Sequence, residues 1–354
     1  MKKTFTRRDM LRGLFGSAAG SLGIPLSGVP SKRTVTLSES KNLNNGMHVI
    51  ITGSGSALVD PLRGNASAAV VVDGTILLFD CGRQTMDNLA LAGINPVNVD
   101  YIIFTHLHFD HIATYDYYII SSWVAGREKP FKVYGPAGTA RMSEGALYAK
   151  NELNTKWWSQ RKDGQKPPVE VKDISSGFVL EEKSFTVTAT EVSHWGQGLG
   201  STSLGYRVDS VYGSIAYSGD TGPTLNMMNL SRGVDVLIHE CTVPDHGMQT
   251  GGSFGKLKDT DYVALEEIDW RKPSKHTSPS ALGQLAAKAK AKMLVPTHLP
   301  PYMSVDAAVE NFKLYYGSRQ PRGIWTEFVC AIKKHYSGPV VMAENAMVID
   351  VGKC

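Results

Sequence analysis

Several apolar, β-branched runs in this chain end on an ionisable residue, and this recurrence favours a fold in which many buried strands end at one edge. Short apolar runs bounded by polar and glycine-rich segments are typical of buried strands. The ionisable residues that follow such runs are Asp80, His106, His194, Asp220, His239 and His298. When many strands end in ionisable groups at one edge of a sheet, those groups can converge on a single cleft while the strands form the core. We therefore expect the functional site at that edge.

The apolar pattern also predicts two similar halves, each running from hairpin to helix to strand. In the first half we expect a strand running into a glycine turn (47–57), a hairpin around Asp73-Gly74 (67–82), a helix from Gln84, a strand (99–106) and a helix from Asp110 to about Ala125. In the second we expect a strand (184–195), a hairpin (202–222), a strand (233–242), a helix (279–291), a strand (292–298), a helix near 304–316 and a closing hairpin. The least periodic segment, 148–171, reads as an insertion.

The stretch FTHLHFDHIA, residues 104–113, places three histidines and an aspartate within six positions. His106 and His108 lie two apart on extended chain, so both point to one side. Asp110 and His111 then begin the next helix, where the chain turns back toward the same space. Such crowding would be costly in a core without a cation to hold it, and zinc suits imidazole and carboxylate ligands best. Four such groups fit poorly around one ion, so we expect two.

This H-x-H-x-D-H run, with its upstream and downstream partners, resembles the metallo-β-lactamase superfamily over about residues 47–352. The resemblance implies an α/β fold, a four-layer αββα sandwich made of two similar halves, with the hydrolase domain spanning 47–354. It implies that one zinc is bound by His106, His108 and His194, that the other is bound by Asp110, His111 and His298, and that Asp220 bridges them. Asp80 would be the buried carboxylate that supports the ligand loop. In di-iron members that reduce oxygen, a Glu usually replaces the second histidine, so His108 favours hydrolysis.

Three further segments, ITGSGSA, IHECT and KHTSP, resemble the ribonuclease Z and arylsulfatase-like branch of this superfamily. By that likeness His276 lies over the metals, is oriented by Glu240, and donates to an oxyanion or leaving-group oxygen. Asp110 is placed to accept the proton of a water that two zinc ions would acidify. We expect a structural role for His239. The remaining histidines, His48, His246 and His335, read as ordinary surface or loop residues.

The substrate is less closely defined by the sequence. Gly222 stands where tRNA-processing members tend to carry an Arg, no basic Gly-Pro arm is evident, and the chain after residue 30 is neutral overall. Because nucleic-acid affinity rests largely on Lys and Arg contacts to phosphate, we expect no nucleic-acid partner. We expect a small-molecule ester instead, a sulfate or phosphate ester cleaved in arylsulfatase-like fashion. Aromatic residues to line its pocket are Tyr115, Tyr117, Tyr118 and the Trp157-Trp158 pair, although core packing explains the tyrosines equally well.

Three alternatives stay open from the sequence. The first is hydrolysis of a lactone or a β-lactam amide. The second is a ribonuclease Z-like phosphodiesterase. The third, from another functional class, is a metal-bound binding protein without turnover. Zinc is the expected metal, with manganese and iron as substitutes, and the sequence is compatible with a homodimer.

The first 30 residues hold Lys2, Lys3, Arg7, Arg8 and Arg12 against one acid, and so account for the whole formal charge of +4. Paired arginines after a Thr, followed by a mildly apolar Gly- and Ala-rich stretch, resemble a twin-arginine export signal. A basic amphipathic helix, a disordered tail and an uncleaved anchor are the alternatives. We expect residues 1–30 to engage the twin-arginine machinery, residues 31–46 to be irregular, and the enzyme to be periplasmic or secreted. The four cysteines are too few for a disulfide scaffold.

Overall fold

The computed structural model describes residues 43–352, apart from 59, 61–62, 195–200, 244, 246–267, 269, 271–273 and 301–321. The predicted export signal, most of the 31–46 segment, His246 and the helix expected near 304–316 lie outside the described residues. No helix within the described residues has the length and apolar content that a bilayer crossing requires.

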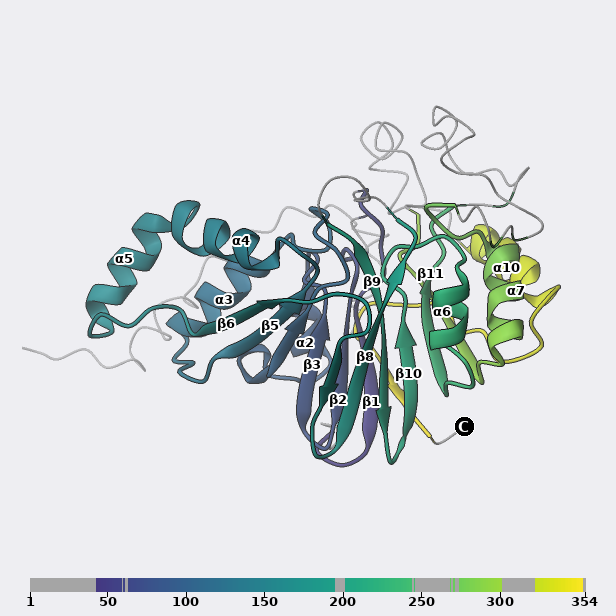
Figure 1. Ribbon diagram of the computed structural model, residues 1–354, viewed down its shortest axis with the longest axis horizontal. Helices are drawn as coiled ribbons and strands as arrows, with labels where there is room; N and C mark the ends of the chain where they lie inside the picture. The colour runs from purple at the N-terminus through teal and green to yellow at the C-terminus, as the bar shows by residue number, and fades with distance from the viewer. Residues whose placement is uncertain are drawn as a thin grey trace, which may run out of the picture. The chain divides into compact units, whose positions relative to one another are not determined.

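Two β-sheets form the centre of the fold (Figure 1). The seven-stranded sheet has the order β13-β1-β2-β3-β4-β5-β6 and the six-stranded sheet the order β12-β11-β10-β9-β8-β7. The first comprises β13 (Met347–Asp350), β1 (Met47–Gly53), β2 (Ser67–Val72), β3 (Thr75–Phe79), β4 (Tyr101–Ile103), β5 (Phe131–Gly135) and β6 (Val169–Asp173). The second comprises β12 (Met293–Thr297), β11 (Val236–Glu240), β10 (Gly213–Tyr217), β9 (Ser203–Ser210), β8 (Phe185–Val192) and β7 (Val179–Glu181).

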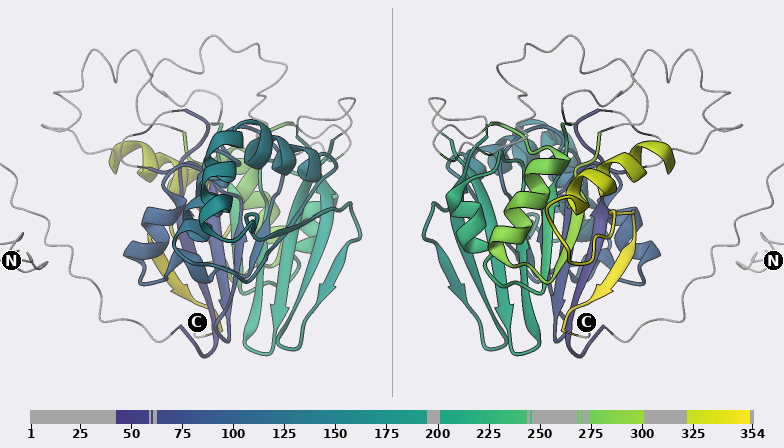
Figure 2. Two further views of the ribbon diagram at one scale, coloured as in Figure 1. Left: turned by 90° about the vertical axis from the view of Figure 1, so that its left-hand side faces the viewer. Right: turned by 90° about the vertical axis from the view of Figure 1, so that its right-hand side faces the viewer.

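Helices cover the outer faces of the two sheets, as both views in Figure 2 show. Beside the first sheet are α2 (Thr85–Leu91), the 3-10 turn η1 (Pro96–Asn98), α3 (Tyr115–Val124), α4 (Thr139–Glu144), the π-helix η2 (Gly145–Ala149) and α5 (Glu152–Arg161). Beside the second are α6 (Leu225–Leu230), α7 (Pro279–Ala289) and α10 (Arg322–Lys333). One apolar cluster lies between the sheets and one lies under each helix layer. This arrangement confirms the predicted αββα sandwich.

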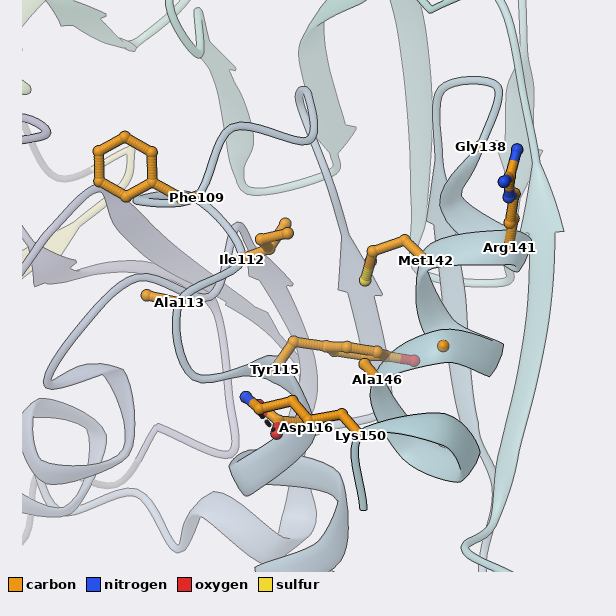
Figure 3. Close-up of a pocket in the computed structure, with 11 residues that line it drawn as sticks. Phe109, Ile112, Ala113, Tyr115, Asp116, Gly138, Arg141, Met142, Ala146 and Lys150 are labelled. Atoms are coloured by element: carbon orange, nitrogen blue, oxygen red, sulfur yellow. Dashed lines mark ion pairs between the residues drawn. The ribbon is translucent and has the colours of Figure 1, made fainter. Parts of the chain in front are cut away.

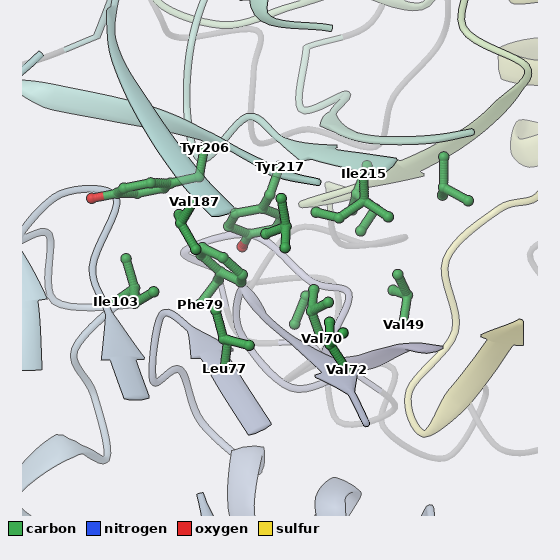
Figure 4. Packing of buried hydrophobic residues seen from close by; sticks show 14 of the residues in the cluster. Val49, Val70, Val72, Leu77, Phe79, Ile103, Val187, Tyr206, Ile215 and Tyr217 are labelled. Carbon is green, nitrogen blue, oxygen red and sulfur yellow. The ribbon is translucent and has the colours of Figure 1, made fainter. Parts of the chain in front are cut away.

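Aromatic side chains pack around Phe79 in the core between the two sheets (Figure 4). Phe79 is fully buried at the end of β3, and its ring centroid lies 5.5 Å from that of Tyr206 and 5.7 Å from that of Tyr217 in the opposite sheet. We predict that Phe79→Ala lowers the free energy of unfolding by about 3–5 kcal/mol, because it opens a cavity between two rigid sheets. Chemical denaturation checks this. Val211→Ala, at a side chain that is 89% exposed, should change stability by less than about 0.5 kcal/mol.

Parallel pairing brings the predicted site residues to one edge. Strands β3, β4 and β5 pair in parallel, and so do β10, β11 and β12. The carboxyl ends of parallel neighbours lie at the same edge, which is where ligand sites form in such sheets. Asp80, His106, Asp220 and His298 follow strands β3, β4, β10 and β12, and His194 follows β8. His239 differs from the prediction because it lies inside β11 rather than after it.

Two predicted elements are wrong, and one segment is more regular than its sequence indicated. The helix expected from Asp110 begins only at Tyr115, because residues 109–114 form turns that hold the histidine loop. The segment 148–171, which we expect to be an insertion, contains α5 and the first three residues of β6, so it forms part of the first sheet and its helix layer. The closing hairpin is instead helix α10 followed by β13, which pairs antiparallel with β1 in the first sheet. Cys81, Cys241 and Cys330 are unpaired.

Candidate metal centre

The seven predicted ligands converge in two adjoining groups. His106, His108, His194 and Asp220 offer ligand atoms within 4.8 Å of one another, and Asp110, His111 and His298 form a second such group. These are the same two sets that the family resemblance implies, although they come from strands of both sheets. All are buried except His108, which is half-buried.

Asp220 lies between the two groups and faces each with a different oxygen. Its Oδ1 lies 3.2 Å from Nε2 of His111 and 3.2 Å from Nε2 of His298. Its Oδ2 lies 3.6 Å from Nε2 of His194 and 3.9 Å from Nε2 of His106. Ligand atoms held at about 2.0–2.1 Å around a tetrahedral zinc lie about 3.3 Å apart, so these spacings suit two ions that share one carboxylate.

Groups outside the centre contact Nδ1 of three of the histidines, and Nε2 of each of these rings faces Asp220. His111 Nδ1 lies 2.8 Å from Asp80 Oδ2, and His194 Nδ1 lies 2.9 Å from the Lys275 carbonyl oxygen. His298 Nδ1 contacts the Thr242 hydroxyl at 2.6 Å. Such contacts fix the ring orientation of metal-binding histidines. Thr242 and Lys275 lie inside the IHECT and KHTSP segments, but the sequence did not predict that they would contact the ligand histidines.

Buried polar atoms without partners support a fit to metal ions. Among the described residues, Nε2 of His106, Nε2 of His111 and Oδ1 of Asp220 are buried and make no hydrogen bond. An unsatisfied buried polar atom costs about 1–3 kcal/mol, so three at one point call for a bound group. Burial lowers the pKa of His194 to about 4 and lowers the pKa of His106 well below its usual value, which keeps these rings neutral and able to coordinate a cation.

The carboxylates of the centre are held ionised. Burial would raise the pKa of Asp220, but the charges of His298 and His111 hold it well below its usual value. Burial opposes ionisation of Asp110 in the same way, and nearby His111 and His298 lower its pKa. Both groups therefore carry negative charge at neutral pH, as a divalent cation requires.

Asp80 anchors the ligand loop from beneath. It is fully buried, and it accepts hydrogen bonds from the Thr105 amide at 2.8 Å and from the Tyr217 hydroxyl at 3.2 Å, besides its contact with His111. Asp80 and His298 also have left-handed backbone, with φ of 59° and 52°. Left-handed backbone is uncommon outside glycine and concentrates at functional sites.

His276 and Glu240 form a buried pair beside the two groups. His276 Nδ1 lies 2.7 Å from Glu240 Oε1, and a ring nitrogen of His276 lies within 4.8 Å of ligand atoms of Asp220 and His298. Burial lowers the pKa of His276, but the charge and hydrogen bond of Glu240 outweigh it and raise the pKa to about 9. The ring is therefore protonated at neutral pH and can act as a hydrogen-bond donor or general acid. Glu240 also accepts from the Thr221 amide at 2.9 Å, which ties the pair to the Asp220 turn.

Gly222 has no room for a side chain, which gives a physical reason for the glycine at this position. A Cβ there would lie 1.8 Å from the carbonyl oxygen of Ser274, at the start of the segment that carries His276. We predict that Gly222→Ala destabilises the protein by about 1–3 kcal/mol and lowers activity, because residues 274–277 must shift. Thermal unfolding and kcat measure both effects. Gly145→Ala is the control for stability, since a Cβ there meets nothing within 4 Å.

The other singled-out residues lie outside the metal centre. His239 is buried, with Nδ1 2.8 Å from the Glu240 carbonyl oxygen. His48 is not a surface residue as expected: it is buried in β1 and pairs with Asp350 at 2.8 Å. His335 is exposed. The aromatic residues that we considered for a substrate pocket do not gather at one place. Tyr115 and Tyr118 are buried in the core, Tyr117 is exposed, and Trp157 lies half-exposed on α5.

Comparisons with known proteins agree with this architecture. A family model described as "Beta-lactamase superfamily domain" matches residues 75–299. Ribonuclease Z of Mycobacterium marinum is 29% identical over 260 residues, which cover 72% of this chain and 87% of that protein. Ribonuclease Z of Methanothermobacter thermautotrophicus is 28% identical over 296 residues, covering 72% of this chain and 86% of that protein. These relatives do not support the arylsulfatase-like expectation.

Two solved structures share the fold. The metallo-beta-lactamase fold protein YhfI from Bacillus subtilis has a TM-score of 0.59 at 19% identity and covers 86% of this chain and 98% of that chain. The short form of human tRNase Z has a TM-score of 0.57 at 20% identity and covers 86% of this chain and 99% of that chain. With a family model that spans most of the chain, a matching fold and His/Asp clusters suited to metal ions, this protein belongs to the metallo-β-lactamase superfamily and is a metal-dependent hydrolase.

Proposed function

We propose that this protein is a dizinc phosphodiester hydrolase of the ribonuclease Z type. The observation that carries the proposal is the position of Asp220, whose two oxygens face two separate groups of histidines. The ribonuclease Z relatives support phosphodiester chemistry, and they weigh against our expectations of a sulfate ester and of no nucleic-acid partner.

The chain supplies the parts that such a reaction needs. Bound zinc ions would lower the pKa of water toward neutrality and offset the charge that builds on an attacked phosphate. Asp110 is ionised and lies at the centre, so its carboxylate can accept the proton of the attacking water. His276 is protonated and held by Glu240, so it can donate a proton to the departing alcohol oxygen. In the overall reaction, the oxygen of water bonds to phosphorus and the bond from phosphorus to the oxygen of one alcohol breaks. That alcohol leaves in its protonated form.

A substrate panel tests this proposal. We expect the zinc-loaded chain to hydrolyse bis(p-nitrophenyl) phosphate, to lose that activity on treatment with a chelator, and to regain it with zinc. Turnover of precursor tRNA in the same panel would place the substrate among RNAs. Higher kcat/KM on p-nitrophenyl sulfate, a lactone or a cephalosporin would overturn the proposal, and two bound zincs without any turnover would favour a binding protein.

We also propose that residues 1–30 direct export by the twin-arginine route, which carries folded proteins and suits an enzyme that must first acquire metal. The paired Arg7 and Arg8 support this. Intact-mass measurement on the protein from exporting cells should show loss of about the first two to three dozen residues. Full-length protein recovered from the cytoplasm would contradict it.

A further inference from the structure

A cavity of about 690 Å³ lies between residues 109–113 of the ligand loop and the segment formed by α4 and the π-helix (Figure 3). Phe109, Ile112 and Ala113 of the loop line one side, and Arg141, Met142 and Ala146 of α4 and the π-helix line the other. The buried ring of Tyr115 extends between the two sides. This volume falls within the range of about 300–1,000 Å³ that is usual for small-molecule sites. The π-helix is a second mark of a functional region, because π-bulges occur frequently at functional sites.

Residues of the ligand loop contribute both to the metal groups and to the lining of the cavity. His106, His108 and Asp110 join the metal groups. Of the residues between them, Phe109 lines the cavity, and Leu107 lies toward the start of α4, since a Cβ on Gly138 would be 3.4 Å from its Cδ1. Phe109, which lines the cavity, is therefore flanked in the chain by the expected metal ligands His108 and Asp110.

The lining is mostly carbon, and its cations among the described residues are Arg141 and Lys150. Phe109 is 70% exposed at the lip, so a large aromatic face remains that a ligand can cover. Lys150 is paired with Asp116 at 2.8 Å, as the dashed line in Figure 3 shows. Arg141, by contrast, makes no ion pair with any described residue. An apolar body with one negative charge complements this lining, whereas the polar edge of a nucleobase would lack partners along it.

We propose that this cavity binds one alcohol portion of the phosphodiester, and that this portion is an apolar aryl or alkyl group ending in an acid. The position of the phosphate rests on the proposed function: with phosphate at the metal centre, the attached alcohol passes Phe109 and its acidic end reaches Arg141. The substrate is thus a small diester with an amphiphilic, anionic alcohol, and the cavity selects for it.

Direct binding tests the cavity without turnover. The probes are 4-phenylbutanoate and its neutral counterpart 4-phenyl-1-butanol, measured by calorimetry on the full chain with zinc and after chelation. We expect the acid to bind more tightly, and Arg141→Gln to remove its advantage, about fivefold for an ion pair near the surface. Phe109→Ala should weaken both probes about three- to tenfold. Tyr117→Ala and Arg161→Gln, at exposed residues outside the cavity, should change neither.

Chelation distinguishes binding of the acid in the cavity from coordination of its carboxylate to the metals. Binding of the acid should survive chelation, whereas loss of binding in the metal-free protein would show carboxylate coordination and overturn the proposal. Equal affinity for acid and alcohol, or no effect of Phe109→Ala, would also overturn it. Ala146→Leu, which fills the cavity from the π-helix, should weaken both probes even if Phe109→Ala folds poorly.

Kinetics then test the link to catalysis. A p-nitrophenyl phosphodiester whose second alcohol is a phenylalkyl chain ending in carboxylate should have a kcat/KM at least about tenfold above that of methyl p-nitrophenyl phosphate. Arg141→Gln should reduce this ratio, and equal values in the unaltered enzyme would overturn the role in specificity. If neither diester is turned over but the probes bind as expected, the proposed function fails while the cavity stands as a binding site.

Discussion

Asp220→Asn is expected to remove at least one of the two zinc ions and to lower kcat/KM on a phosphodiester by about 10³-fold or more. Asn keeps the shape of the side chain but lacks the negative charge, and only one of its two side-chain atoms can ligate a cation. The two oxygens of Asp220 face His111 and His298 on one side and His194 and His106 on the other. Zinc content per chain, measured by elemental analysis, should fall from two to at most one.

Thermal unfolding separates metal loss from misfolding. Zinc should raise the Tm of the unaltered protein, because a ligand that binds only the folded state stabilises it, and should raise that of Asp220→Asn much less. After chelation the variant should still unfold cooperatively. Asp209→Asn is the control, since Asp209 pairs with Arg207 on β9 with its side chain 43% exposed. A variant with two zincs and unchanged turnover would refute the bridging role.

His276→Ala is expected to keep both metals and to lower kcat by about 10²–10⁴-fold, the range for loss of a general acid. His276 is not one of the seven predicted ligands, and Glu240 holds it through Nδ1 at 2.7 Å. The effect should be larger for an alkyl leaving group than for p-nitrophenolate, because a good leaving group needs no proton. Rates on the two diesters, with zinc content, are the measurements.

The leaving-group comparison distinguishes a donor from a structural residue. Equal losses on both diesters would show that His276 only positions other groups, and loss of zinc would show that it is a ligand. His276→Ala leaves the buried Glu240 carboxylate unpaired and should therefore lower the stability of the protein. His276→Gln keeps a hydrogen bond to Glu240, so it should be more stable than His276→Ala while its kcat stays as low. His335→Ala, at an exposed histidine, should leave both rates unchanged.

Much of the fold was predictable because its elements have local signals. Asp73 and Gly74, with φ of 47° and 79°, indicate the turn between β2 and β3 without any distant contact. Pro279 likewise indicates the start of α7. The wrong predictions concern segments whose conformation depends on long-range contacts. Residues 109–114 have an apolar pattern that suits a helix, but long-range contacts hold them in turns. Asp110 and His111 belong to a group of expected ligands, and the Cys81 amide donates a hydrogen bond to the His111 carbonyl oxygen at 2.6 Å. Strand β13 pairs with β1 across nearly the whole chain, which no local pattern indicates.

The sequence indicated which side chains come near one another, because alternation on extended chain sets the side on which a side chain lies and the end of a strand sets its edge. The family resemblance supplied the ligand role expected of each. How they meet depends on the tertiary fold, which sets the Asp220 oxygen that faces each pair of histidines and the close approach of Gly222 to Ser274. It also sets the 2.7 Å geometry of the expected His276–Glu240 pair. The same holds for the cavity between Phe109 and Arg141. The physical reason is that a side chain's own segment sets its direction, whereas its partners depend on how two sheets and their loops pack.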